Sequence, residues 1–389
     1  MIRLRWKNTW IDYEKVEWSG TDVQCSRQIT FSVAWNPYDR IEKNNIALGD
    51  LVYLYDGKKG IFLGQVTSRE KKGTIGTAEY TAMDFMHHLL RSNGTYKFKN
   101  KTPEAITKTL CKSLGIGVSK LATTRFNIAK VIYEDQCIYD IIVGVYKKAK
   151  AHTKKKYMPV MDGKMVSVII KGKSSGVNLG QGYNVTDATY SDTLDNMVDK
   201  VVIYNEKRKK LGEVKNKKHI SKYGTYQQAY TKEKGVNAKK SAKALLVGIT
   251  KTATVTAVGN IKAISGRSIV LKDKATGLSG TFYITSDTHT FENNTHMMTL
   301  ELSWVNSMGE SAEETSTKKN KSGSKKKVTN ASKAYYLNSS KVYHSSKACP
   351  ACKGKNLKTS TVQALKKIKI TKGANKGKRK YRACSKCWR

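Results

Sequence analysis

The sequence predicts a mainly β protein with α+β inserts, followed by a flexible linker and a small zinc-binding domain. Apolar and polar residues alternate with a period of two in several short segments. Proline is rare, with 4 residues in 389, whereas the 21 tyrosines and 29 glycines suit strands joined by turns. Beyond residue 308 apolar residues become sparse, and four cysteines occur in two close pairs.

The first ninety residues read as short strands. Ile2, Leu4 and Trp6 alternate with basic residues, and the same pattern recurs over residues 29–33. The run LVYLYDGKKGIFLGQV at 51–66 contains two apolar stretches around an Asp-Gly turn, which predicts a β-hairpin.

Two helices are expected next. The first begins after Thr102, with proline at the first helical position, and ends before Gly115. The second covers residues 138–146, where apolar residues recur at helical spacing. A hairpin around an Asp-Gly turn is then expected within 156–170.

The third block, from about residue 183 to 308, predicts strands with one insert. Residues 198–205 read as a strand, and residues 225–246 read as a helix, broken near Gly235. The block closes with a hairpin around Asn293-Asn294. In its last strand one face is apolar, formed by Met298, Leu300, Leu302 and Trp304.

Charge is the most unusual bulk property. The formal net charge is +42, and the 75 residues from Thr315 onward hold 23 Lys and Arg but no Asp or Glu. Such a field attracts nucleic acid, anionic cell-wall polymers or acidic protein surfaces. The alternative is that a lysine-rich source supplies many solvated lysines.

The first residues, the apolar runs and the isolated cysteines indicate the compartment in which the protein is assembled. The start MIRLRWKNTW is interrupted by charge and does not resemble a signal peptide, and no apolar run reaches the length of a membrane span. Cys25, Cys111 and Cys137 are isolated and are expected to be reduced core residues. We therefore expect assembly in the cytoplasm.

No catalytic constellation can be assigned. Walker, nucleophile-elbow and zinc-protease motifs are absent from the sequence. Asp287, His289 and His296 flank one predicted hairpin and are open to two interpretations, a metal site or polar turn residues. The pair His87-His88 is expected to serve packing.

The terminal cysteines carry the strongest local signal. Cys349 and Cys352 form one CxxC pair, and Cys384 and Cys387 form a second. Each pair directs two thiolates at one ion, and a module of this size with few large apolar residues needs such a cross-link. We predict a structural Zn²⁺ site, and the main alternative is a disulfide pair.

The pattern of tyrosine, histidine and cysteines in this module also resembles a small zinc module appended to secreted nucleases and other proteins. That resemblance implies one histidine and three cysteines as ligands, here His344, Cys349, Cys384 and Cys387. The extra Cys352 and the long basic stretch before Cys384 depart from that module. His344 and Cys352 therefore compete for one position, and the four-cysteine set is slightly favoured.

The rest of the chain resembles the XkdQ-type baseplate hub proteins of contractile phage tails and tail-like bacteriocins, which are relatives of the late-control protein D family. The resemblance covers roughly residues 1–308, and the zinc module lies outside it. It is carried by AWNPYDR (34–40), DLVYLYDGKKGIFLGQV (50–66), KTPEAITKTLCKSLGI (101–116), DNMVDKVVIYN (195–205), KYGTYQQAYTKEKGVNAKKSAKALL (222–246) and the segment 258–304, which ends in the closing hairpin.

The resemblance implies a domain plan. It comprises a tube-type β-barrel at 1–95, an α/β region at 96–190 and a second β-barrel at 191–308 with the inserted helix 225–246. Composition, and not the resemblance, predicts a linker at 309–333 followed by the separate basic zinc module at 334–389.

The same resemblance implies a homotrimer whose six barrels form a pseudo-six-fold ring between the tail tube protein and the spike or tip protein. Other baseplate proteins and the tape-measure protein are further expected partners. The C-terminal module is expected to contact an anionic polymer. The implied location is the baseplate of a phage virion or tail-like particle assembled in the bacterial host.

The function expected is therefore structural, without catalysis. Two alternatives remain open at this point. One is a tail-associated peptidoglycan hydrolase. The other is a basic zinc-containing nucleic-acid-binding protein, which the net charge and the cysteine pairs favour.

Overall fold

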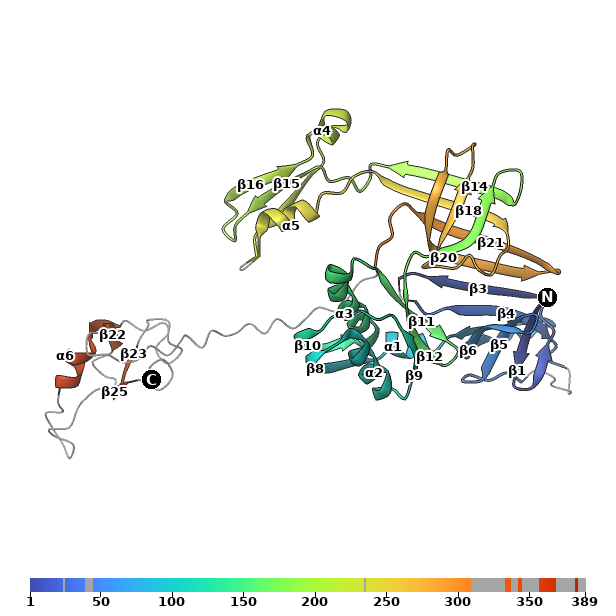
Figure 1. The fold of residues 1–389 in the computed structure, drawn as a ribbon, viewed down its shortest axis with the longest axis horizontal. Coiled ribbons are helices and arrows are strands. Elements are labelled where there is room, and N and C mark those ends of the chain that lie inside the picture. Colours follow the sequence, from blue (N-terminus) through green and yellow to red (C-terminus); the bar gives the residue numbers. More distant parts are fainter. Residues whose placement is uncertain are drawn as a thin grey trace. The chain divides into compact units, whose positions relative to one another are not determined.

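The computed structural model describes residues 1–23, 25–38, 45–233, 236–308, 333–336, 342–344, 357–368 and 382–383 (Figure 1). The chain divides into two compact units, Met1–Thr315 and Ser316–Arg389. Strands dominate the described part of the first unit, so the mainly β prediction is confirmed.

The first β-domain packs around one apolar core. The alternation in the sequence places Leu4, Ile29, Phe31 and Val52 in this core, and all four are almost fully buried. Its strands are β1 Ile2–Trp6, β2 Thr9–Ile11, β3 Lys15–Thr21, β4 Gln28–Trp35, β5 Leu51–Asp56, β6 Lys59–Glu70 and β7 Gly76–Met83. The hairpin predicted at 51–66 is formed by β5 and β6.

The second β-domain has a separate core, which includes Val255, Phe282 and Leu300. Its strands are β13 Ser174–Gly180, β14 Val185–Thr193, β18 Thr250–Val258, β19 Ser268–Lys272, β20 Ser279–Glu292 and β21 Thr295–Ser303. β13 pairs with β19 and β14 pairs with β18. Strand pairing puts β13 and β14 in this domain. The domain plan placed β13 and residues 185–190 of β14 in the α/β region and residues 191–193 in the second barrel.

The hairpin of β20 and β21 forms as the sequence predicts. Asn293 and Asn294 both have positive φ, 49° and 56°, which is the conformation that a two-residue turn between twisted strands requires. Met298, Leu300 and Leu302 are buried on one face. Trp304 lies beyond the strand and is 38% exposed, so its predicted place on the buried face is wrong. It packs edge-on against Phe282 instead, with ring centroids 5.6 Å apart.

One strand pair joins the two β-domains. β20 pairs antiparallel with β3 over seven residues, from Ser286 opposite Thr21 to Glu292 opposite Lys15. The result is one 13-stranded sheet that runs through both domains. Figure 1 shows β3 and β20 side by side, although some 260 residues separate them in the sequence.

An α/β region packs on a third core, which includes Ile106, Leu110, Ile141 and Tyr146. Its elements are α1 Met86–Leu90, β8 Asn93–Lys101, α2 Pro103–Ser113, β9 Gly117–Leu121, β10 Ile128–Cys137, α3 Ile138–Thr153, β11 Tyr157–Asp162 and β12 Met165–Ile170. Both predicted helices are confirmed. At the start of α2 the Thr102 hydroxyl accepts a hydrogen bond from the Ala105 amide at 3.2 Å, as an N-cap residue does.

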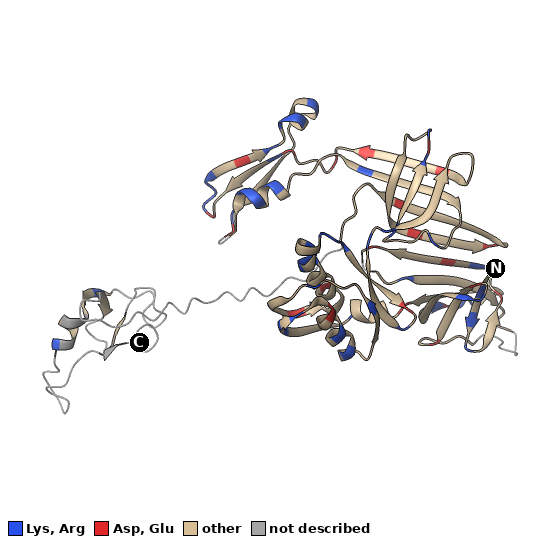
Figure 2. Ribbon diagram, in the orientation of Figure 1, with Lys and Arg blue, Asp and Glu red and all other residues tan. Residues whose placement is uncertain are grey.

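A small basic subdomain is inserted between β14 and β18. It contains β15 Lys200–Tyr204, β16 Lys210–Lys215, α4 Lys217–Tyr223, β17 Gln227–Thr231 and α5 Ala238–Ala244. The expected helix over 225–246 is wrong in its first half. Residues 227–231 pair in parallel with β15 instead, because this pairing satisfies a sheet edge that local helix propensity cannot detect. Figure 2 shows lysines along α4 and α5.

In the second unit the structure describes a four-stranded sheet and one short helix. These are β22 Lys333–Tyr336, β23 Val342–His344, β24 Lys358–Thr361, α6 Val362–Lys367 and β25 Arg382–Ala383. The predicted linker 309–333 lies outside the described residues except for Lys333, which begins β22. Within the described residues, no helix combines the length and apolar character needed to cross a membrane.

Candidate functional site

The seam between the two β-domains holds an ion pair whose carboxylate is buried and whose arginine is 18% exposed. Arg27, just before β4, reaches Asp287 on β20: Nη1 lies 3.0 Å from Oδ1 and Nη2 lies 2.5 Å from Oδ2. The Asp287 side chain is fully buried, and the Ser265 amide donates to it at 2.6 Å. Burial raises the pKa of Asp287, but Arg27 and His289 outweigh burial and hold the pKa far below its usual range.

Trp18 and Gly20 of β3 determine where the Arg27 guanidinium lies. The guanidinium carbon lies 4.1 Å from the centre of the Trp18 ring, a cation–π contact. A Cβ atom at Gly20 would lie 2.6 Å from Arg27 Nη1, so glycine at this position leaves room for the guanidinium. One arginine thus lies against Trp18 and Gly20 of β3 and pairs with a carboxylate of β20.

Two histidines continue the same network. His289 is fully buried, with Nδ1 3.0 Å from His296 Nε2 and Nε2 3.1 Å from the Ala263 carbonyl oxygen. Asp287 Oδ2 lies 3.5 Å from His289 Nε2. Burial and the neighbouring His289 lower the pKa of His296 to about 4.

The structure therefore brings Asp287, His289 and His296 together. Asp287 and His289 are buried strand residues, so their interpretation as polar turn residues is wrong. Both ring nitrogens of His289 already contact other protein atoms. Across the described residues, no group of three or more His, Cys, Asp and Glu side chains is arranged to hold a metal ion.

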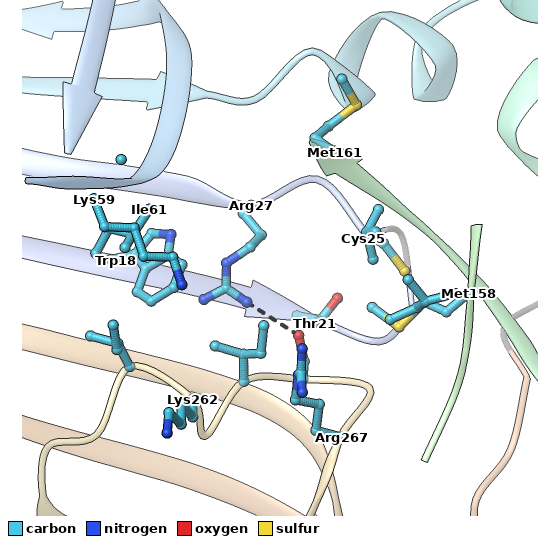
Figure 3. A pocket seen from close by; sticks show the side chains of 16 residues that line it. Trp18, Thr21, Cys25, Arg27, Lys59, Ile61, Met158, Met161, Lys262 and Arg267 are labelled. Atoms are coloured by element: carbon cyan, nitrogen blue, oxygen red, sulfur yellow. Dashed lines mark hydrogen bonds between the residues drawn. The ribbon is translucent and has the colours of Figure 1, made fainter. Parts of the chain in front are cut away.

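A cavity of about 500 Å³ lies beside this network (Figure 3). Three parts of the chain line it: the first β-domain, the α/β region, and the loop between β18 and β19. In Figure 3, Lys59 and Trp18 lie on one side, and Cys25 and Met158 lie on the other. Arg27 Nη1 donates to the Ser265 hydroxyl oxygen at 3.4 Å, and both residues line the cavity.

Three of the residues expected to serve packing, His87, Cys25 and Cys111, are buried. His87 is buried with Nδ1 2.7 Å from the Asp84 carbonyl oxygen, so its packing role is confirmed. Cys25 and Cys111 are buried, and burial raises the pKa of each thiol to about 12. The Tyr139 hydroxyl donates to Cys25 Sγ at 2.9 Å. These thiols stay protonated and unreactive at neutral pH.

The predicted zinc ligands fall mostly outside the described residues. Cys349, Cys352, Cys384 and Cys387 are all outside them. His344 is described: it ends β23, pairs opposite Tyr335 and is 3% exposed. The Zn²⁺ site remains a prediction.

Sequence reasoning missed Arg27 and Trp18 as functional residues. Each is a single polar or aromatic residue in a strand-rich stretch, and their partners lie some 260 positions away. No local pattern in the sequence links positions so far apart.

The family model described as YQBQ-like matches residues 16–303. The chain belongs to the YQBQ-like family. Two relatives from Bacillus subtilis (strain 168) extend this match. The uncharacterized protein YqbQ is 26% identical over 306 residues, covering 76% of this chain and 93% of that protein. The phage-like element PBSX protein XkdQ is 25% identical over 308 residues, covering 76% and 94%. The resemblance to XkdQ-type proteins is thus confirmed.

Solved structures show that the family fold is shared more widely. The 43 kDa tail protein of prophage MuSo2 from Shewanella oneidensis matches with a TM-score of 0.62 at 15% identity, covering 77% of this chain and 97% of that one. A tail protein from Neisseria meningitidis MC58 matches with a TM-score of 0.57 at 13% identity, covering 77% and 95%. At these identities the likeness concerns the fold.

Proposed function

We propose that this YQBQ-like protein is a structural baseplate hub of a contractile phage tail or tail-like particle. Three copies would form a ring of six β-domains that joins the tail tube to the spike or tip. The observation that carries the proposal is the β3–β20 pairing, which fuses two separately packed β-domains into one continuous sheet. The similarity to XkdQ of the PBSX phage-like element, which is 25% identical over 308 residues, supports it.

The continuous sheet matters for a ring, because each subunit must hold its two β-domains in a fixed relative orientation. A flexible connection would let the two domains turn independently and would add an ordering cost when the ring closes. Seven paired residues and the Arg27–Asp287 ion pair hold the two domains together here. Three rigid subunits then suffice for a closed ring.

A structural role also agrees with the chemistry of the seam. Asp287 forms an ion pair with Arg27, and the two ring nitrogens of His289 contact His296 and the Ala263 carbonyl oxygen. Since both side chains are fully buried, they have no access to a polymer substrate. We therefore propose a hub without catalytic activity, and a zymogram on cell walls that shows clearing would contradict this.

The C-terminal module extends the proposal. We propose that Zn²⁺ bound by Cys349, Cys384, Cys387 and either Cys352 or His344 stabilises the module, without a catalytic role. The sequence offers two CxxC pairs, and His344 is buried beside a strand of the small sheet. The high density of lysine would let this module contact an anionic polymer of the cell wall or DNA.

Purified particles test the hub proposal. Cells of the source strain are induced, tail-like particles are purified, and the chain is quantified by mass spectrometry beside negative-stain images. About three copies per particle are expected for a closed three-subunit ring. A strain that lacks the gene should produce no complete baseplates, and the intact gene should restore them. Normal particles without this chain would overturn the proposal.

A further inference from the structure

The cavity beside the seam combines an apolar wall with unpaired positive charge. Its apolar part is formed by Trp18, Ile61, Met158, Val160, Met161, Ile169, Ile261 and Ile264. A volume of about 500 Å³ falls within the range of pockets that hold ligands. Methionine side chains adapt to varied shapes, so this wall suits an apolar side chain inserted from outside.

Four basic side chains line the same cavity: Arg27, Lys59, Lys262 and Arg267. Arg27 is neutralised by Asp287, which is itself fully buried. Within the described part of the chain the other three have no carboxylate partner, and no Asp or Glu is among the lining residues. The cavity therefore carries a local excess of positive charge.

Two arginine donors behind the cavity wall lack hydrogen-bond partners among the residues that the structure describes. The Nε atoms of Arg27 and Arg267 are inaccessible to solvent and have no hydrogen-bond partner in the described part of the chain. A buried donor without an acceptor costs about 1–3 kcal/mol, so such groups are uncommon in folded proteins. A carboxylate in the cavity would instead accept hydrogen bonds from the outer part of the Arg267 guanidinium, a group that favours paired contacts with carboxylates.

We propose that this cavity binds a segment of a partner tail protein that presents an apolar side chain next to an Asp or Glu carboxylate. The apolar side chain packs against Met158, Met161 and Ile61, and the carboxylate meets Arg267 with Lys59 and Lys262 at the rim. The identity of the partner rests on the proposed hub function, but the chemistry of the cavity does not.

The first experiment measures the chemistry on the purified full-length protein. Binding of the capped tetrapeptide Leu-Phe-Asp-Glu is compared with that of Leu-Phe-Asn-Gln by calorimetry. The acidic peptide should bind the wild-type protein. The Kd of the Asn-Gln peptide should be about tenfold higher or more, and so should the Kd of the acidic peptide for Arg267→Met. Lys272→Met is the matched control, since Lys272 is exposed on β19 and does not line the cavity.

Folding of the variants is checked by thermal unfolding. If Arg267→Met is unstable, Lys59→Met replaces it, because Lys59 is exposed at the cavity and its removal leaves no buried gap. Absence of binding, equal binding of both peptides, or an equal loss in Lys272→Met would overturn the proposal. These outcomes do not depend on whether the protein is a hub.

The second experiment identifies the occupant in purified particles. Met161 is replaced by a photoreactive benzoylphenylalanine, and Met165, which is 43% exposed outside the cavity, carries the same group as a control. Mass spectrometry should find cross-links from position 161 alone to another tail protein, at a peptide that contains Asp or Glu beside an apolar residue. Cross-links to this chain itself, to lipid, or to neutral peptides would overturn the proposal.

Discussion

Lys171 Nζ lies 2.5 Å from Asp22 Oδ2, and the two side chains are 2% and 5% exposed. The same ammonium donates to the Ser307 carbonyl oxygen at 2.5 Å. This contact ties together three distant places in the chain: the end of β12, the end of β3 and the segment after β21. It joins the α/β region to the two fused β-domains within the first unit.

Lys171→Met should lower the free energy of unfolding by about 3–5 kcal/mol at pH 7, because it leaves the Asp22 carboxylate buried without its partner. Burial already raises the pKa of Asp22, against the opposing effect of Lys171. Removal of Lys171 raises this pKa further. The loss should therefore be smaller near pH 4, where Asp22 takes up a proton, than at pH 7. Urea unfolding at the two pH values measures this difference.

The matched double variant Lys171→Met/Asp22→Asn separates the ion pair from general damage. With both charges gone, no unpaired buried charge remains, so its stability should exceed that of Lys171→Met at pH 7. Equal stabilities of the single and double variants would show that the two charges do not interact.

Asp287→Asn should also destabilise the protein by about 3–5 kcal/mol at pH 7, because Arg27 is left in the seam without a counter-charge. The pKa of Asp287 is depressed in the folded state. Its contribution is therefore fully present above the unfolded pKa of about 3.9 and is lost as the pH falls below that value. Denaturant unfolding should show the deficit at pH 7 shrinking at pH 3. Asp195→Asn, at an exposed loop position, should change little at either pH.

His296→Gln should flatten the pH dependence of stability between pH 4 and pH 6.5. The folded-state pKa of His296 is about 4, below its ordinary value of 6.5. The unfolded chain thus binds a proton in this window before the folded chain does, and wild-type stability should fall as the pH falls through it. His219→Gln, outside the network, serves as the control. An unchanged slope in His296→Gln would show that His296 titrates normally.

Zinc content tests the C-terminal module. One Zn²⁺ per chain is expected by atomic emission, and Cys384→Ser should abolish it. The zinc affinities of Cys352→Ser and His344→Ala are then compared. The variant that loses more affinity identifies the fourth ligand. Chelation should unfold this module while particles stay assembled. Particles that fall apart with chelator would assign the metal to the ring instead.

The sequence predicted best where local rules decide the structure. The Asp-Gly turn between β5 and β6, the Thr102 cap of α2 and the Asn293-Asn294 turn each need only a few neighbouring residues. The prediction at 225–246 failed because residues 227–231 gain a parallel partner in β15, which is more than twenty residues away. The local helix or strand propensity of a segment carries no information about a partner strand so far away in the sequence.

The sequence by itself determined that the protein is mainly β, that Met298, Leu300 and Leu302 face a core, and that it resembles the XkdQ-type proteins. It also singled out Asp287, His289 and His296 as polar residues on one hairpin. Only the tertiary structure decided that Arg27 pairs with Asp287 and that Lys171 pairs with Asp22. The physical reason is that a side-chain pattern sets which face of a strand is buried, whereas the partner across a sheet depends on how distant strands pair.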